Sequence, residues 1–158
     1  MEDVLPPQTE HGAGFELTRV RQFTVFMENR VGRLQALVRA FETKAQKIVA
    51  LSIHNQTDTA LVRIICSDAD IGREILRREG FYFSEQDVLV VELPKSAQPL
   101  TVICATLLSA ELNIHYAYPL LVRPGEPAVA VYLDDPTLAV QLLIKKGFKL
   151  LAETDLRK

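Results

Sequence analysis

The chain has 158 residues, 48% of them hydrophobic and 24% charged, with a formal net charge of −2. This balance is typical of a globular protein, and it offers no excess of positive charge for binding nucleic acid or anionic lipid. No apolar run approaches the roughly 20 residues of a membrane-spanning helix. The acidic, proline-bearing N-terminus also lacks the features of a signal peptide. We therefore expect a cytoplasmic protein with no nucleic-acid or membrane partner.

The first half of the chain predicts the order β-α-β-β-α-β. Residues 1–16 show no periodicity and are expected to form a mobile tail. The alternation of apolar residues predicts strands at residues 17–27, 48–54, 60–66 and 81–83. Apolar residues at helical spacing follow Leu34, and a second helix is expected to begin after Asp68 and to end at Gly80.

The second half repeats this order. Strands are predicted at residues 88–93, 113–122, 128–133 and 150–152, with a turn at residues 124–125. One helix is predicted near residues 100–108, and another begins after the cap residue Asp135. The first of these helices is apolar nearly all round, so we expect it to be buried on more than one side. Its expected inward residues are Leu100, Ile103, Cys104, Leu107 and Leu108.

The two halves therefore form an internal repeat. Leu34 aligns with Leu100, and Ile48 aligns with Ile114 at the same offset. A β-α-β-β-α-β unit corresponds to the ferredoxin-like plan of an antiparallel sheet with two helices on one face. The predicted fold is α+β, with two such repeats at residues 17–86 and 87–158 packed side by side, their sheets continuing each other through edge strands.

The turn at residues 28–34 is the strongest candidate for a binding site. It joins a strand to a helix start, where free N–H groups and the helix dipole attract an anion. Gly32 allows a ligand to approach the backbone, and the Asn29 amide offers both a donor and an acceptor. An α-carboxylate is the natural occupant. A purely local explanation is also open, in which Gly32 relaxes the turn and Asn29 caps the helix.

This repeat and its turn resemble the ACT domain, the regulatory amino-acid-binding module of many biosynthetic enzymes. Asn29, Gly32 and Leu34 match the family's turn, although Val31 stands where a proline is frequent. The resemblance extends over about residues 17–156 and is closest to stand-alone tandem ACT proteins. The first repeat is also similar to the regulatory small subunit of acetolactate synthase.

The resemblance implies a ligand between two ACT units, held by the turn of one and by an Asn-Ile pair on the second strand of the other. The turn is intact only in the first repeat, and the strand motif is intact only in the second, as Asn113-Ile114-His115. The implied site thus combines Asn29, Arg30, Val31, Gly32 and Leu34 with Asn113, Ile114 and His115. One amino acid would bind per chain.

Other chemistry has little support in the sequence. We find no nucleophile–base pair, no phosphate-binding glycine loop and no metal-ligand spacing, so we expect no catalytic residues, no metal and no cofactor. Cys66 and Cys104 lie in apolar segments and are expected to be buried free thiols. We expect a non-catalytic, homodimeric amino-acid sensor that acts on a biosynthetic enzyme. The alternatives are a regulatory subunit of an acetolactate-synthase-like enzyme and an acylphosphatase-like hydrolase on the same fold.

Overall fold

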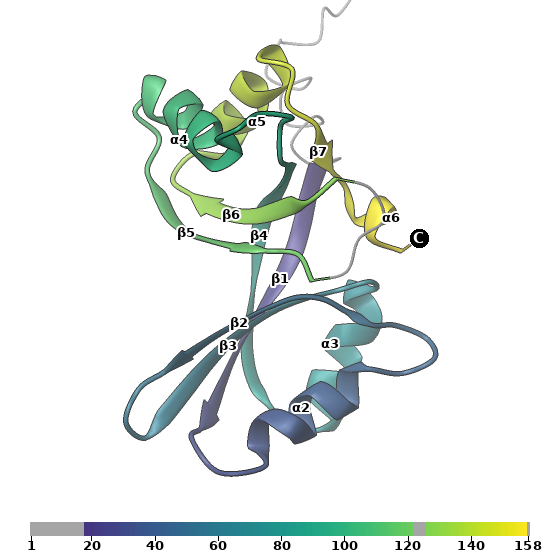
Figure 1. The fold of residues 1–158 in the computed structure, drawn as a ribbon. Helices are drawn as coiled ribbons and strands as arrows, with labels where there is room; N and C mark the ends of the chain where they lie inside the picture. Colours follow the sequence, from purple (N-terminus) through teal and green to yellow (C-terminus); the bar gives the residue numbers. More distant parts are fainter. Residues whose placement is uncertain (1–17, 122–125, 158) are drawn as a thin grey trace, which may run out of the picture.

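The computed structural model describes residues 18–121 and 126–157. The expected N-terminal tail and the expected turn at residues 124–125 lie outside these ranges. Strands and helices alternate as the repeat predicts (Figure 1). In chain order the elements are β1 (Arg19–Glu28), α2 (Arg33–Phe41), β2 (Ile48–Asn55), β3 (Thr59–Cys66), α3 (Ala69–Arg78), β4 (Tyr82–Glu92), α4 (Pro99–Ser109), β5 (Ile114–Pro119), β6 (Ala128–Leu133), α5 (Pro136–Lys145), β7 (Leu150–Leu151) and α6 (Glu153–Leu156).

Each repeat has its own apolar core between its sheet and its two helices. In repeat 1, β1 directs Phe23 and Val25 towards α2 and α3, where both side chains are fully buried beside Leu37 and Phe41. In repeat 2, Leu89, Val91 and their neighbours pack under α4 and α5 in the same way. The alternation of side chains along each strand therefore places one face of each sheet on its helices.

Strand β4 belongs to both repeats. Its first part pairs with β1, and its last part pairs with β6 on one edge and with β7 on the other. The prediction of two separate short strands at residues 81–83 and 88–93 is therefore wrong, because one strand continues through the polar residues between them. The charged side chains among these polar residues find partners on neighbouring elements, since Glu85 pairs with Arg73 and Asp87 pairs with Arg19. The expected boundary between residues 86 and 87 falls inside this strand.

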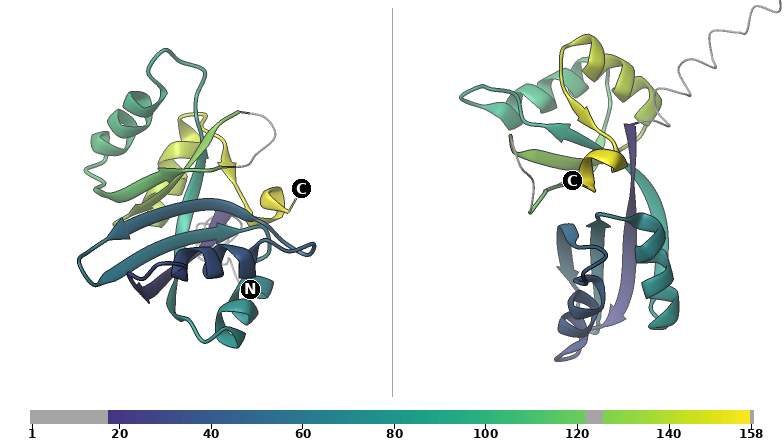
Figure 2. Two further views of the ribbon diagram at one scale, coloured as in Figure 1. Left: turned by 60° about the horizontal axis from the view of Figure 1, so that its bottom comes forward. Right: turned by 90° about the vertical axis from the view of Figure 1, so that its right-hand side faces the viewer.

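The repeats lie side by side and share one seven-stranded sheet with the order β2-β3-β1-β4-β6-β5, in which β7 pairs with β4. The sheet bends so that the helix-free faces of its two halves turn towards each other. Helices α2 and α3 cover the outer face of repeat 1, and α4 and α5 cover the outer face of repeat 2 (Figures 1 and 2). At one end the edge strands meet, where Leu121 N donates to Val49 O at 2.7 Å. A third apolar cluster fills the space between the repeats near this closure.

Several local predictions are confirmed, and others are wrong. Asp68 and Asp135 accept backbone N–H groups at the starts of α3 and α5, as expected of N-cap residues. In α4, however, Leu100, Cys104 and Leu108 are exposed rather than inward. The helix is apolar nearly all round, but repeat 2 covers only one side of it. The short helix α6 was not predicted.

Candidate functional site

The turn between β1 and α2 leaves the start of the helix open. Gly32 is the N-cap residue of α2 and has φ of +85°, a left-handed conformation that favours glycine. Among the described residues, no side chain caps α2, and its first turn carries no acidic residue. Asn29 therefore does not cap the helix, and the local explanation of this residue is wrong. The Arg33 N–H donates to the Arg30 carbonyl at 3.2 Å, which leaves the next N–H groups of the first turn of α2, those of Leu34 and Gln35, available to an anion.

Asn29 instead ties the turn to the loop between β2 and β3. Its backbone N–H donates to the Asp58 carbonyl at 3.0 Å, and its side-chain Nδ2 approaches the Gln56 carbonyl at 3.4 Å. These bonds hold the turn beside the end of β2. The side chain is exposed, as are Arg30, Val31 and Gly32.

The arginines of the turn differ in their contacts. Arg30 pairs with Glu28, whereas the guanidinium of Arg33 lies 4.9 Å from the ring centroid of Phe81. Stacking on an aromatic ring restrains Arg33 while its charge stays free for a ligand. Together with the helix dipole, Arg33 makes the surface of the turn favourable for a carboxylate.

Three hollows border this turn. One of about 160 Å³ is lined by Asn29, Arg30, Arg33 and Leu34 together with residues of β1, β2 and β3. A second of about 350 Å³ lies between Arg30, Arg33 and Tyr82. The largest, about 550 Å³, is mainly apolar and includes Phe26, Leu61 and Tyr82. Only the latter two volumes fall in the range typical of small-molecule sites.

The second group of predicted site residues lies in repeat 2. Asn113 precedes β5, and its carbonyl accepts the Asp134 N–H at 3.3 Å. His115 Nε2 lies 2.5 Å from Asp134 Oδ1. No residue of 113–115 lines the three hollows at the turn. In Figures 1 and 2 the turn lies at the end of repeat 1 that is remote from repeat 2, whereas β5 begins beside α4.

A polar network between the repeats was not predicted. Gln22 of β1 is fully buried; its Nε2 donates to the Tyr116 hydroxyl at 2.7 Å, and its Oε1 accepts from Tyr118 at 2.5 Å. Thr24 donates to Gln86 Oε1 at 2.6 Å. The signal in the sequence was the alternation of Gln22 and Thr24 with the apolar residues of β1, which indicates a second face that is polar and covered.

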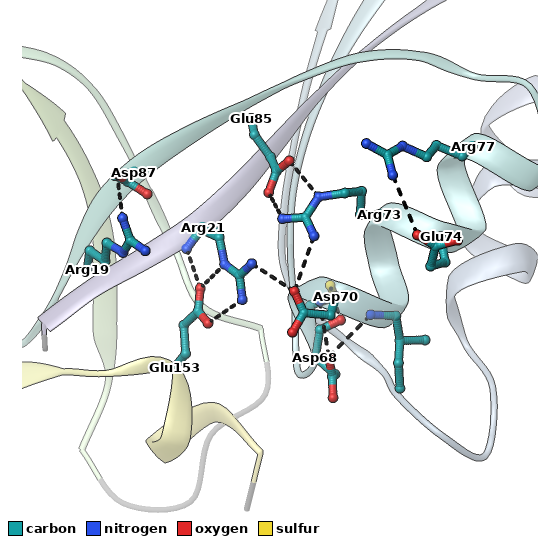
Figure 3. Close-up of polar contacts among 12 residues, drawn as sticks. Arg19, Arg21, Asp68, Asp70, Arg73, Glu74, Arg77, Glu85, Asp87 and Glu153 are labelled. Atoms are coloured by element: carbon teal, nitrogen blue, oxygen red, sulfur yellow. Dashed lines mark hydrogen bonds and ion pairs between the residues drawn. The ribbon is translucent and has the colours of Figure 1, made fainter. Parts of the chain in front are cut away.

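Charged side chains join the C-terminal helix to repeat 1 (Figure 3). Glu153 of α6 accepts Arg21 Nε at 2.8 Å and Nη2 at 2.9 Å, while Arg21 Nη1 reaches Asp70 at 2.9 Å. Arg73 binds Glu85 and also contacts Asp70, so the network continues to β4. It connects both repeats on the side remote from the turn.

The pKa values follow these contacts. Burial opposes ionisation of Glu153, but the hydrogen bonds and charge of Arg21 outweigh it, so the pKa of this carboxyl is lowered. Hydrogen bonds from Arg21 lower the pKa of Asp70, and those from Arg73 lower the pKa of Glu85. All three carboxylates are therefore held in their charged form.

Among residues 18–121 and 126–157, no group of three or more histidine, cysteine or acidic side chains is placed to hold a metal ion. No helix in these ranges is long and apolar enough to cross a membrane. The paired βαββαβ units and the open glycine turn define the chain as a pair of ferredoxin-like units with a candidate ligand-binding turn.

Comparison with known proteins agrees with this class. The model of the ACT domain pair family matches residues 18–158, and the chain belongs to this family. The structure is similar to that of protein BT0572 from Bacteroides thetaiotaomicron, with 25% identity, a TM-score of 0.80, and coverage of 89% of this chain and 97% of that one.

It also resembles the ligand-free regulatory subunit of aspartate kinase from Thermus thermophilus, with 11% identity, a TM-score of 0.56, and coverage of 84% and 95%. At this identity the likeness concerns the fold alone. No curated protein matches the sequence. Membership of the ACT domain pair family supports a regulatory, ligand-binding role.

Proposed function

We propose that this chain is a non-catalytic, cytoplasmic sensor that binds a free amino acid at an interface between ACT repeats. The observation that carries the proposal is the β1–α2 turn. It combines an uncapped helix start, a glycine at φ of +85° and two arginines that line hollows of about 160 and 350 Å³. The amino acid's carboxylate would bind the N–H groups of α2, with Asn29 beside it.

The second component of the proposed site is Asn113 with Ile114 and His115. Because these residues lie in repeat 2 away from the turn of the same chain, we propose that a second copy supplies them. The sensor would then be a homodimer with two equivalent composite sites. Amino-acid binding would stabilise one arrangement of the two chains, and a biosynthetic enzyme would respond to that arrangement.

Thermal unfolding in the presence of each of the twenty common amino acids tests this function. At a hundred times its dissociation constant, a bound amino acid should raise Tm by about 5–10 °C for a chain of this size. Gly32→Leu should abolish the rise, because the side chain is strained at this φ and would stand in front of the helix amides.

Gly147→Leu is the matched control. Gly147 also has φ of +85°, and a Cβ there meets nothing within 4 Å among the described residues, as at Gly32. Both variants should lose similar stability, but only Gly32→Leu should lose the ligand-dependent rise. An equal rise in the two variants would contradict the proposed site.

Mixing two variants tests whether the site is shared between chains. Gly32→Leu and Asn113→Ala should each bind poorly alone. After subunit exchange, heterodimers would hold one intact site, so about a quarter of the sites should recover. No recovery from freely exchanging variants would exclude a site built from two chains.

A further inference from the structure

The helix-free face of repeat 1 carries an arginine without a counter-ion. Arg63 of β3 points towards repeat 2, where its guanidinium carbon lies 3.7 Å from the ring centroid of Tyr116. In the part of the chain that the structure describes, Arg63 makes no ion pair or hydrogen bond, and its Nε is buried without a partner. Stacking on a tyrosine stabilises the half-buried arginine, but its buried Nε–H still requires an acceptor.

Tyr116 presents a second free donor at the same place. Its oxygen accepts the hydrogen bond from Gln22, and within the described ranges its own O–H has no acceptor. The ring is fixed by Tyr132, which stacks on it at 5.1 Å. The acceptors of the surrounding network are already used, since Gln22 Oε1 accepts the Tyr118 hydroxyl and Gln86 Oε1 accepts the Thr24 hydroxyl. The side chains around Arg63 and Tyr116 thus offer more donors than acceptors.

Apolar space adjoins these donors. Arg63 pairs across the sheet with Thr24, and the next row on the same face contains Leu61, Phe26 and Tyr82 in register. Leu61 lies two residues from Arg63 along β3, about 7 Å away. Leu61, Phe26 and Tyr82 all line the hollow of about 550 Å³, and Phe26 and Tyr82 are 49% and 83% exposed.

We propose that Arg63 and Tyr116, together with the adjoining hollow on repeat 1, bind a small monocarboxylate with an apolar tail and no amino group, such as a branched 2-oxo acid or carboxylic acid. Arg63 and the Tyr116 hydroxyl would bind the carboxylate, and Leu61, Phe26 and Tyr82 would cover the tail. An α-ammonium group is disfavoured because Glu28, the carboxylate that lines the adjoining hollow, is already paired with Arg30. The hollow that would cover the tail also borders the β1–α2 turn, but Arg63 and Tyr116 are not part of the proposed amino-acid site, so the proposal does not depend on that site.

The Nε–H resonance of Arg63 in a proton–nitrogen NMR spectrum reports on this site directly. The probes are 4-methyl-2-oxopentanoate, 3-methylbutanoate, L-leucine and 3-methylbutan-1-amine, with sodium chloride as the ionic-strength control. The two acids without an amino group should shift the resonance saturably. L-Leucine should bind at least tenfold more weakly there, and the amine should have no effect. No shift with either acid, or an equal shift with the amine, would overturn the proposal.

Substitutions separate binding from a structural role. Arg63→Gln should lower the affinity for 4-methyl-2-oxopentanoate, measured by calorimetry, by about ten- to a hundredfold, and Tyr116→Phe should lower it by about tenfold. Arg39→Gln, an exposed arginine at the end of α2, is the control and should change nothing. The ligand-free Tm of Arg63→Gln should fall only slightly, by about 1–4 °C, because the arginine loses its stacking on Tyr116 but no ion pair or hydrogen bond. A fall of several degrees with unchanged acid binding would show that Arg63 is structural.

This test is independent of the turn. If Gly32→Leu abolishes an amino-acid response but leaves the Arg63 shift intact, both sites stand. If the Arg63 shift fails while the amino-acid response survives, only the inference about Arg63 is lost.

Discussion

Replacement of Glu153 by glutamine should loosen the contact between the C-terminal helix and repeat 1. The carboxylate accepts Arg21 Nε and Nη2 at 2.8 and 2.9 Å and the Arg21 backbone N–H at 3.0 Å. The Glu153 side chain is only 24% exposed, so water screens these bonds incompletely. Glutamine offers one acceptor without charge, and Arg21 keeps Asp70 as a partner. The expected loss is about 1–3 kcal/mol of unfolding free energy.

For a chain of this length each kcal/mol corresponds to about 2–4 °C in Tm. Calorimetric unfolding at pH 7 should therefore show a clearly lower Tm for Glu153→Gln. The control is Glu74→Gln, because Glu74 pairs with Arg77 across 3.6 Å while both side chains are mostly exposed. That surface pair should contribute almost nothing.

The same variant has a defined pH dependence. The folded-state pKa of Glu153 is lowered, so its stabilising contribution is present above the unfolded value of about 4.3 and is lost as the pH falls through the folded value. The difference in Tm between the wild type and Glu153→Gln should be constant near neutrality and shrink below about pH 4. Equal Tm values for the Glu153 and Glu74 variants at pH 7 would refute this account of the contact.

Two further predictions concern the core and the thiols. Gly72→Ala should destabilise the protein by about 1–3 kcal/mol, because the added Cβ would lie 2.6 Å from Cys66 Sγ and 3.0 Å from Phe23. In denaturant unfolding, adding Cys66→Ala to this variant should relieve much of the cost. If the losses of unfolding free energy of the two single variants simply add in the double variant, the clash is contradicted. In a thiol-reagent titration, Cys104 should react in the folded protein and Cys66 only after unfolding, because Cys104 is exposed whereas burial raises the pKa of Cys66 to about 12. Rapid reaction of two thiols per folded chain would contradict this.

Local patterns predicted most of the fold. The β-α-β-β-α-β order, the caps at Asp68 and Asp135 and the core residues of β1 all follow from short-range periodicity. The continuity of β4 did not, because the polar residues at 84–87 are characteristic of a loop unless distant partners satisfy them. Glu85 finds Arg73 on α3, and Asp87 finds Arg19 on β1, which are contacts made only in the folded chain.

The candidate site was predictable where one segment contains it. The turn with Gly32 is continuous in sequence, and its open helix start was expected. The role of Arg63 was not identified, because its sequence neighbourhood is that of any solvated strand residue and its contact with Tyr116 is made with the other repeat. In α4, periodicity predicted an apolar helix, but which apolar residues are covered depends on how far repeat 2 extends around it.

Isothermal titration calorimetry of the intact chain against each of the twenty common amino acids tests the central claim most directly. We expect saturable heat from one amino acid, or from a small group of related ones, at one molecule per chain, with the heat abolished by Gly32→Leu and retained by Gly147→Leu. The absence of binding heat from all twenty would contradict the assignment of this ACT domain pair as an amino-acid sensor.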